Sequence, residues 1–87
     1  MSGFEKVLGD IVYELRTMNP RKFKMPLWID ADLVIIPHKR LGYYDISVKD
    51  SRGHLTASGS CDYNTDDETL REAIRGVARN AYLKIGI

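Results

Sequence analysis

Three side chains in this sequence are of the kinds that serve as nucleophile or general base: His38, His54 and Cys61. A Cys61–His54 dyad requires the two side chains to lie within hydrogen-bond reach, with a third group orienting the imidazole. Their spacing does not demand that arrangement, and a lone cysteine near a strand end is more often a small, half-buried apolar residue. We therefore expect no catalytic cysteine.

Four other residues, Asp30, Asp32, Asp45 and Lys49, resemble in type and order the site of a metal-dependent nuclease. The acidic residue expected two positions before the lysine is Ser47, so the metal ligands would be incomplete. The sequence also has no glycine-rich phosphate loop and no metal-ligand spacing. It predicts a protein that is not an enzyme and uses no metal and no cofactor.

Positive charge recurs at four-residue spacing at Arg71, Arg75 and Arg79. On a helix this spacing places three guanidinium groups along one side, where they could contact phosphates or a partner's carboxylates. Further positive charge comes from two segments, Arg21-Lys22-Phe23-Lys24 and His38-Lys39-Arg40. The alternative, which we favour, is that the arginines pair with acidic residues of the same helix, namely Asp67, Glu68 and Glu72.

Aromatic side chains could anchor a protein partner, because they are enriched at the energetic centres of interfaces. The candidates are Trp28, Tyr43, Tyr44 and Tyr63. Trp28 is expected to complete the core instead. Tyr43 and Tyr44 are adjacent, so within a strand they point to opposite faces and at least one should be accessible.

Two helices are expected at the ends of the chain. Apolar residues at three- and four-residue spacing predict the first from about Gly3 to Met18, with Ser2 and Glu5 as a capping box. The second is predicted to begin at Thr65, which would cap it together with Glu68. Its core stripe should consist of Leu70, Ala73, Ile74, Val77, Ala78 and Ala81, while Gly76 and the alanines allow close approach to a sheet.

Three strands are expected between the helices, after an irregular basic segment from Arg21 to Pro26. They centre on Leu33–Ile36, on the alternating residues from Tyr44 to Lys49, and on residues 54–60, where Gly59 indicates a bulge or a close backbone approach. Pro37 should end the first ladder or mark an edge. The order α-β-β-β-α predicts one α+β domain spanning residues 1–87, with a three-stranded antiparallel sheet packed on one face by two helices.

Length and composition limit the remaining options. A chain of 87 residues buries only about 60–65% of its unfolded surface, so a partner or homo-oligomer is expected to add stability. One cysteine excludes an intramolecular disulfide and suits a reducing compartment. No apolar run approaches the ~20 residues of a membrane span, and no secretory signal pattern is present at the start. We expect a cytoplasmic protein that does not enter a membrane.

The α-β-β-β-α order resembles the double-stranded-RNA-binding domain, and Pro37-His38 looks like the loop whose histidine reads the RNA minor groove in that family. Where the family carries a lysine cluster, this chain has Asp66, Asp67 and Glu68. The strand–turn–strand–helix portion also resembles the arm-binding domains of phage integrases. In style the chain is similar to small α/β proteins of phages and mobile elements, including some anti-CRISPR inhibitors, which implies a protein target in the host cytoplasm.

These observations predict a non-enzymatic protein-interaction module, and the last resemblance implies a phage-encoded inhibitor of a host defence protein. The alternative is a small nucleic-acid-binding domain. The residues expected to contact the partner in either case are Arg71, Arg75, Arg79, His38, Lys39, Arg40, Tyr43 and Tyr44.

Overall fold

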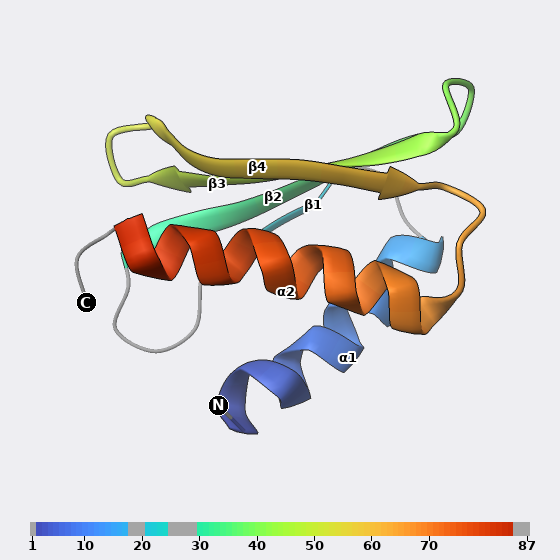
Figure 1. Ribbon diagram of the computed structural model, residues 1–87, viewed down its shortest axis with the longest axis horizontal. Helices are drawn as coiled ribbons and strands as arrows, with labels where there is room; N and C mark the ends of the chain where they lie inside the picture. Colours follow the sequence, from blue (N-terminus) through green and yellow to red (C-terminus); the bar gives the residue numbers. More distant parts are fainter. Residues whose placement is uncertain (1, 18–20, 25–29, 85–87) are drawn as a thin grey trace.

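The computed structural model describes the backbone of residues 2–17, 21–24 and 30–84, and the side chains of residues 6–16 and 30–84. Its elements are α1 (Ser2–Thr17), β1 (Arg21–Lys24), β2 (Ala31–His38), β3 (Tyr43–Asp50), β4 (Leu55–Asp62) and α2 (Asp67–Lys84). The strands form one antiparallel sheet in the order β1-β2-β3-β4, with both helices on the same side (Figure 1). The predicted α+β order of helix, antiparallel sheet and helix is confirmed.

The short strand β1 is an addition to the predicted sheet, because it occupies the segment expected to be irregular. It pairs with β2 only from Asp32 to Ile35. Pro37, which has no amide hydrogen to donate, therefore lies beyond β1 and pairs with Tyr44 on the β3 side alone. Trp28 lies outside the described residues, as do the side chains of Ser2 and Glu5.

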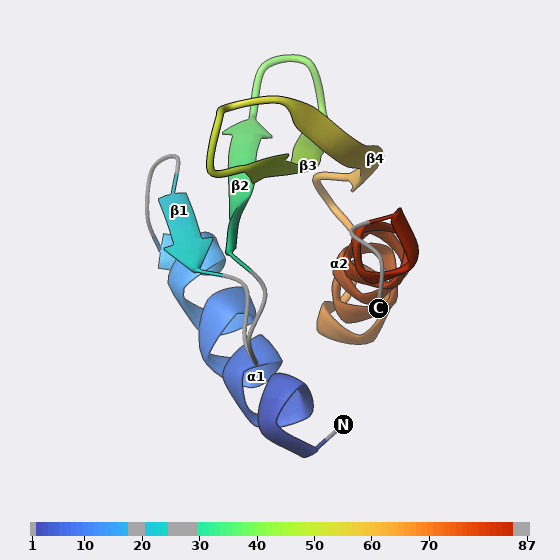
Figure 2. The same ribbon diagram turned by 90° about the vertical axis from the view of Figure 1, so that its left-hand side faces the viewer.

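Buried apolar residues alternate with more exposed residues along β2 and β3, which gives the sheet one apolar face. Leu33 and Ile35 of β2 stand opposite Val48 and Ile46 of β3, and all four are buried. Both helices cover this face, α1 under β1 and β2 and α2 under β4 (Figure 2). The core is completed by Leu8, Ile11, Val12 and Leu15 of α1 and by Leu70, Ile74, Val77, Ala78, Ala81 and Tyr82 of α2. Within the described ranges, no helix is long and apolar enough to cross a membrane.

Helix α2 packs so closely on β4 that any side chain at position 59 would force Val77 to shift. A Cβ atom placed there would lie 2.8 Å from Cγ2 of Val77. The close approach expected at Gly59 is confirmed, while the register shift lies earlier, where Val48 pairs with Ala57 but Lys49 pairs with Leu55. Gly76 was expected to allow the same close packing, but it is exposed and nothing in the described structure would meet its Cβ.

The start of α2 corrects a second expectation. The helix begins at Asp67, and Oδ1 of Asp66 accepts a hydrogen bond of 2.8 Å from the amide of Thr69. Asp66 is therefore the N-cap, one residue after the predicted Thr65. The sequence contains capping residues at both positions, and the backbone carbonyl of Thr65 is engaged elsewhere, as shown below.

A tight turn joins β3 and β4. Oδ1 of Asp50 accepts from the amides of Arg52 and His54 at 2.9 Å each, and Gly53 has a φ of 85° that favours glycine. The bond from the His54 amide, together with that from Arg52, lowers the pKa of Asp50 below its ordinary value. This carboxylate holds the turn by an Asx-type arrangement.

Candidate interaction surface

The turn between β2 and β3 projects from the sheet (Figure 1). It carries two cations beside an apolar side chain. Gly42 closes the turn, with a φ of 83° and an amide that donates to the carbonyl of His38 at 2.8 Å. Lys39, Arg40 and Leu41 are exposed, and Leu41 is 71% exposed. We call residues Lys39–Leu41 the hairpin tip. An exposed leucine between cations and a tight glycine turn is a protruding contact point.

The base of the hairpin tip is formed by a stacked aromatic pair. His38 and Tyr43 are cross-strand partners at the ends of β2 and β3, with ring centroids 4.7 Å apart and planes inclined by 29°. Both side chains are partly exposed. The structure thus brings together four of the predicted contact residues, His38, Lys39, Arg40 and Tyr43.

Tyr44 does not belong to this surface, which corrects the prediction for that residue. It points to the helix-covered face, is only 1% exposed, and stacks on Tyr63 with ring centroids 5.0 Å apart. Burial raises its phenol pKa, and the nearby Arg16 charge opposes that shift. The alternation argument correctly placed the two tyrosines on opposite faces, and the register decides that Tyr43 is the accessible one.

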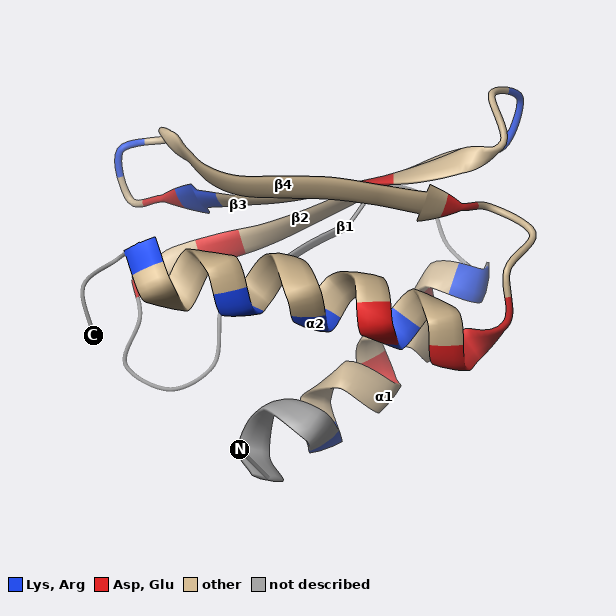
Figure 3. Ribbon diagram, viewed as in Figure 1, with Lys and Arg blue, Asp and Glu red and all other residues tan. Residues whose placement is uncertain are grey.

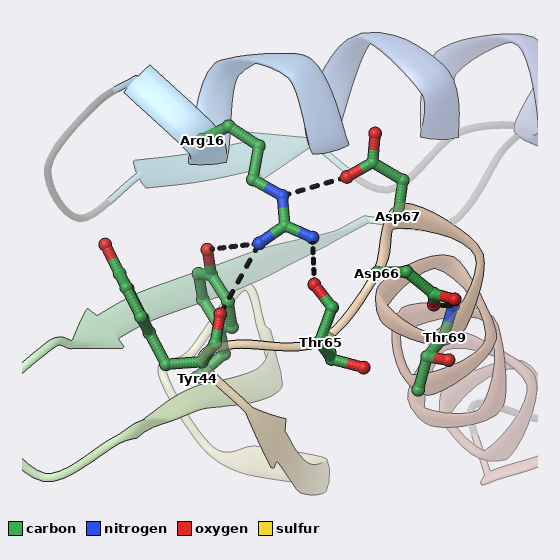
Figure 4. Close-up of polar contacts among 7 residues, drawn as sticks. Arg16, Tyr44, Thr65, Asp66, Asp67 and Thr69 are labelled. Atoms are coloured by element: carbon green, nitrogen blue, oxygen red, sulfur yellow. Dashed lines mark hydrogen bonds and ion pairs between the residues drawn. The ribbon is translucent and has the colours of Figure 1, made fainter.

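A residue that the sequence did not single out, Arg16, links the end of α1 to the approach to α2 (Figure 4). Its Nε donates to Oδ1 of Asp67 at 2.9 Å, and its Nη2 donates to the carbonyl of Thr65 at 2.6 Å. Its Nη1 lies 3.4 Å from both the Tyr44 hydroxyl and the Tyr63 carbonyl. One guanidinium therefore holds three elements together. The only signal in the sequence was a basic residue in the last turn of a helix.

The three arginines predicted to line one side of a helix, Arg71, Arg75 and Arg79, lie on α2, and we call them the arginine ridge. Two of them form ion pairs within that helix. Nη1 of Arg71 is 3.5 Å from Oε2 of Glu68, and Arg75 is paired with Glu72. Arg79, the third member, is exposed. The favoured interpretation, pairing with acidic residues of the same helix, is confirmed for Arg71 and Arg75.

The ridge and the hairpin tip do not form one basic surface. The tip extends beyond the end of the sheet near which α2 begins, whereas the arginines lie along α2 beneath the sheet (Figure 3). The segment leading to α2 passes close to the turn, where the Tyr63 amide donates to the Gly42 carbonyl at 2.9 Å. That segment ends at Asp66, and the first turn of α2 adds the acidic residues Asp67 and Glu68. Negative charge therefore stands between the two groups of cations.

The arrangement argues against the catalytic alternatives. Cys61 and His54 are seven residues apart along the extended β4 segment, which separates them by roughly 23 Å and excludes a dyad. Burial also raises the pKa of the Cys61 thiol, which disfavours the thiolate. On the face of the sheet that the helices do not cover, Asp32 of β2 pairs with Lys49 of β3. Asp45 pairs with Ile36, which lies four residues after Asp32 along β2. Among the described residues no cluster of three acidic, histidine or cysteine side chains could hold a metal ion.

No family model, curated protein or solved structure matches this chain.

Proposed function

We propose that the chain is a non-enzymatic protein-interaction module that binds its target through the hairpin tip. The observation that carries this proposal is the 71% exposed Leu41 between Arg40 and the Gly42 turn, at the end of the β2–β3 hairpin. A leucine exposed in this way fills an apolar pocket of a partner without a conformational change in the hairpin. Lys39 and Arg40 then pair with carboxylates around that pocket.

The stacked His38–Tyr43 pair supports the same surface. Its rings are held in place by cross-strand stacking, so little side-chain freedom is lost on binding. Tyrosine and arginine are the residue types that concentrate binding energy at interfaces. The partner is therefore a protein with an apolar pocket rimmed by Asp and Glu.

A protein target is favoured over nucleic acid by the charges around the tip. Phosphate backbones require a continuous run of Lys and Arg, because affinity grows with the number of phosphates neutralised. Here the carboxylates of Asp66, Asp67 and Glu68 follow the tip, and Arg71 and Arg75 are already paired. Leu41 also has no role in contacting phosphates.

The resemblance to small phage proteins, including anti-CRISPR inhibitors, supports a more specific proposal about the target. In that view the chain is phage-encoded, works in the host cytoplasm, and blocks a host defence protein by occupying its surface. No catalytic group is needed for such occlusion, since affinity alone determines the effect.

Affinity capture from host lysate tests this proposal, with identification of the bound protein and measurement of its affinity in purified form. We expect wild type to bind one acidic protein in nuclease-treated lysate and the triple variant K39E/R40E/L41D to lose it. The matched control is S51E/R52E, which adds negative charge at the β3–β4 turn and should bind normally. Retention only when nucleic acid is left intact, or equal loss in both variants, contradicts the proposed surface.

A further inference from the structure

The end of the β2–β3 hairpin is supported by other strands on one side only. Strand β1 pairs with β2 from Asp32 to Ile35, so the last residues of β2, up to His38, have no neighbour on that side within the described ranges. On the other side, β4 pairs with β3 as far as Asp62, which lies opposite Tyr43. The hairpin tip is therefore held from the side of β4 and of the connection that follows it.

A backbone hydrogen bond on this side joins the turn to Tyr63. The carbonyl of Gly42 accepts from the Tyr63 amide at 2.9 Å, and the Gly42 amide closes the turn by donating to the carbonyl of His38 at 2.8 Å. Gly42 therefore takes part both in the turn and in its link to the segment between β4 and α2. The position of the Tyr63 amide helps to determine where the turn lies.

Two contacts from other elements restrain Tyr63. Its ring stacks on the ring of Tyr44, which is only 1% exposed, with centroids 5.0 Å apart and planes inclined by 21°. Its carbonyl lies 3.4 Å from Nη1 of Arg16, a distance near the upper limit for a hydrogen bond. The stacked ring is therefore the stronger of the two restraints.

We propose that Tyr63 is a positioning residue for the hairpin tip, and that its stacked ring fixes the orientation in which the tip meets its target. The restraint passes from the Tyr44 ring and the Arg16 guanidinium through the Tyr63 backbone to the Gly42 carbonyl. This role does not require Tyr63 to touch the target. The inference rests on the proposed function, because it takes Lys39–Leu41 as the surface that binds.

A positioning residue and a contact residue differ in their effect on binding rates. A tip that is free to tilt presents the binding orientation for only part of the time, and the apparent Kd rises in inverse proportion to that fraction. Association is then slower, but dissociation is unchanged, because the complex has the same contacts once it has formed. Loss of a contact side chain such as Leu41 instead speeds dissociation.

The rates of association and dissociation with the captured and purified target test this role. We expect Tyr63→Ala to slow association roughly tenfold, as for a tip that is competent about a tenth of the time, and to leave dissociation unchanged. Tyr63→Phe keeps the stacked ring and should bind like wild type, whereas Leu41→Ala should dissociate faster. The matched control is Tyr13→Ala, which removes a 74% exposed tyrosine of α1 and should change neither rate.

Hydrogen exchange of the unbound chain tests the positioning without a target. In Tyr63→Ala, protection of the amides of residue 63 and Gly42 should fall roughly tenfold relative to that of Ile46 in the core, because the ratio separates local opening from a change in global stability. Arg16→Met should lower the same ratio by less, and Tyr13→Ala should leave it unchanged.

Unchanged protection at Gly42 in Tyr63→Ala overturns the proposal. Association as fast as that of wild type, or faster dissociation, does so as well, and so does a Tyr63→Phe variant as impaired as Tyr63→Ala. Failure of the proposed function is a separate result, because it is shown by K39E/R40E/L41D retaining the target. The exchange measurement then decides on its own whether Tyr63 positions the tip.

Discussion

Arg16 on α1 and the three arginines on α2 are the same side chain on two helices of one small domain, but they are engaged differently. Arg16 donates to the hydroxyl, carbonyls and carboxylate of residues between 28 and 51 positions away in sequence. Arg71 and Arg75 pair with glutamates only three residues away. Arg71 and Arg75 are paired within their own helix, whereas the isolated Arg16 links segments that are distant in the sequence.

This difference shows what periodic spacing can and cannot indicate. Spacing of four residues places side chains on one side of a helix, and nearby acidic residues are then available as partners. It contains no information on which distant groups a helix end will meet. The contacts of Arg16 exist only because β3 and the β4–α2 connection fold back over the end of α1.

The largest effect should follow from breaking the Arg16 contacts. Arg16→Met keeps the apolar stem but removes every hydrogen bond to Asp67, Thr65, Tyr63 and Tyr44. We expect a loss of about 2 kcal/mol in the free energy of unfolding, because charged hydrogen bonds contribute more than neutral ones, although the exposed Asp67 pair is screened by solvent. Urea unfolding provides the measurement, and Arg16→Lys should recover less than half of the loss because it lacks the planar fork. A loss no greater than that of Arg79→Ala would remove the contrast between the two helices.

A smaller loss, about 1 kcal/mol, is expected for Asp66→Ala, which deletes the cap of α2. Thr65→Ala is the matched control, because Thr65 uses its backbone carbonyl and not its side chain to accept from Arg16. Its unfolding midpoint should therefore remain close to wild type. If Thr65→Ala proved the more damaging change, the helix would begin at the position predicted from the sequence alone.

The N-cap of α2 shows which structural features could be predicted from the sequence and which could not. The helices, the tight β3–β4 turn, the alternation of β3 and the glycine at position 59 follow from local rules, and all are present. The choice between Thr65 and Asp66 could not be made in that way, because both residues can cap a helix. Similarly, β1 lacks an apolar pattern and forms through pairing with β2, so only the tertiary structure defines it.

The candidate interaction surface could also be predicted only in part from the sequence. Residue type identified His38, Lys39, Arg40 and Tyr43, but a single leucine in a turn, here Leu41, carries no signal in the sequence that marks it as a contact residue. Its exposure depends on the projection of the turn beyond the helices. Tyr44 was included for its type and excluded by the register of β3.

Acid should weaken the capping contact that Asp66 makes at the start of α2. Hydrogen bonds from the Thr69 side chain and amide lower the pKa of Asp66 below its ordinary value of 3.8. The contribution of this carboxylate is therefore fully present above the unfolded-state pKa and is lost as pH falls through the lower folded-state pKa. Thermal unfolding followed from neutral pH to below pH ~4 should show a shallower acid decline in Asp66→Asn than in wild type. Parallel curves for the two proteins would show that Asp66 is not a cap in solution.

The smallest effects are expected on α2. Arg71→Ala and Arg75→Ala should each cost about 0.3–0.5 kcal/mol, the usual contribution of a three- or four-residue ion pair, and the loss should shrink as salt is added. Arg79→Ala should change the free energy of unfolding by less than about 0.5 kcal/mol, as is common for exposed positions. These variants also separate stability from function: all three should still capture the target bound through the hairpin tip. Loss of target binding by the Arg79 variant, with stability unchanged, would assign the exposed end of the ridge to the interface and extend the contact surface onto α2.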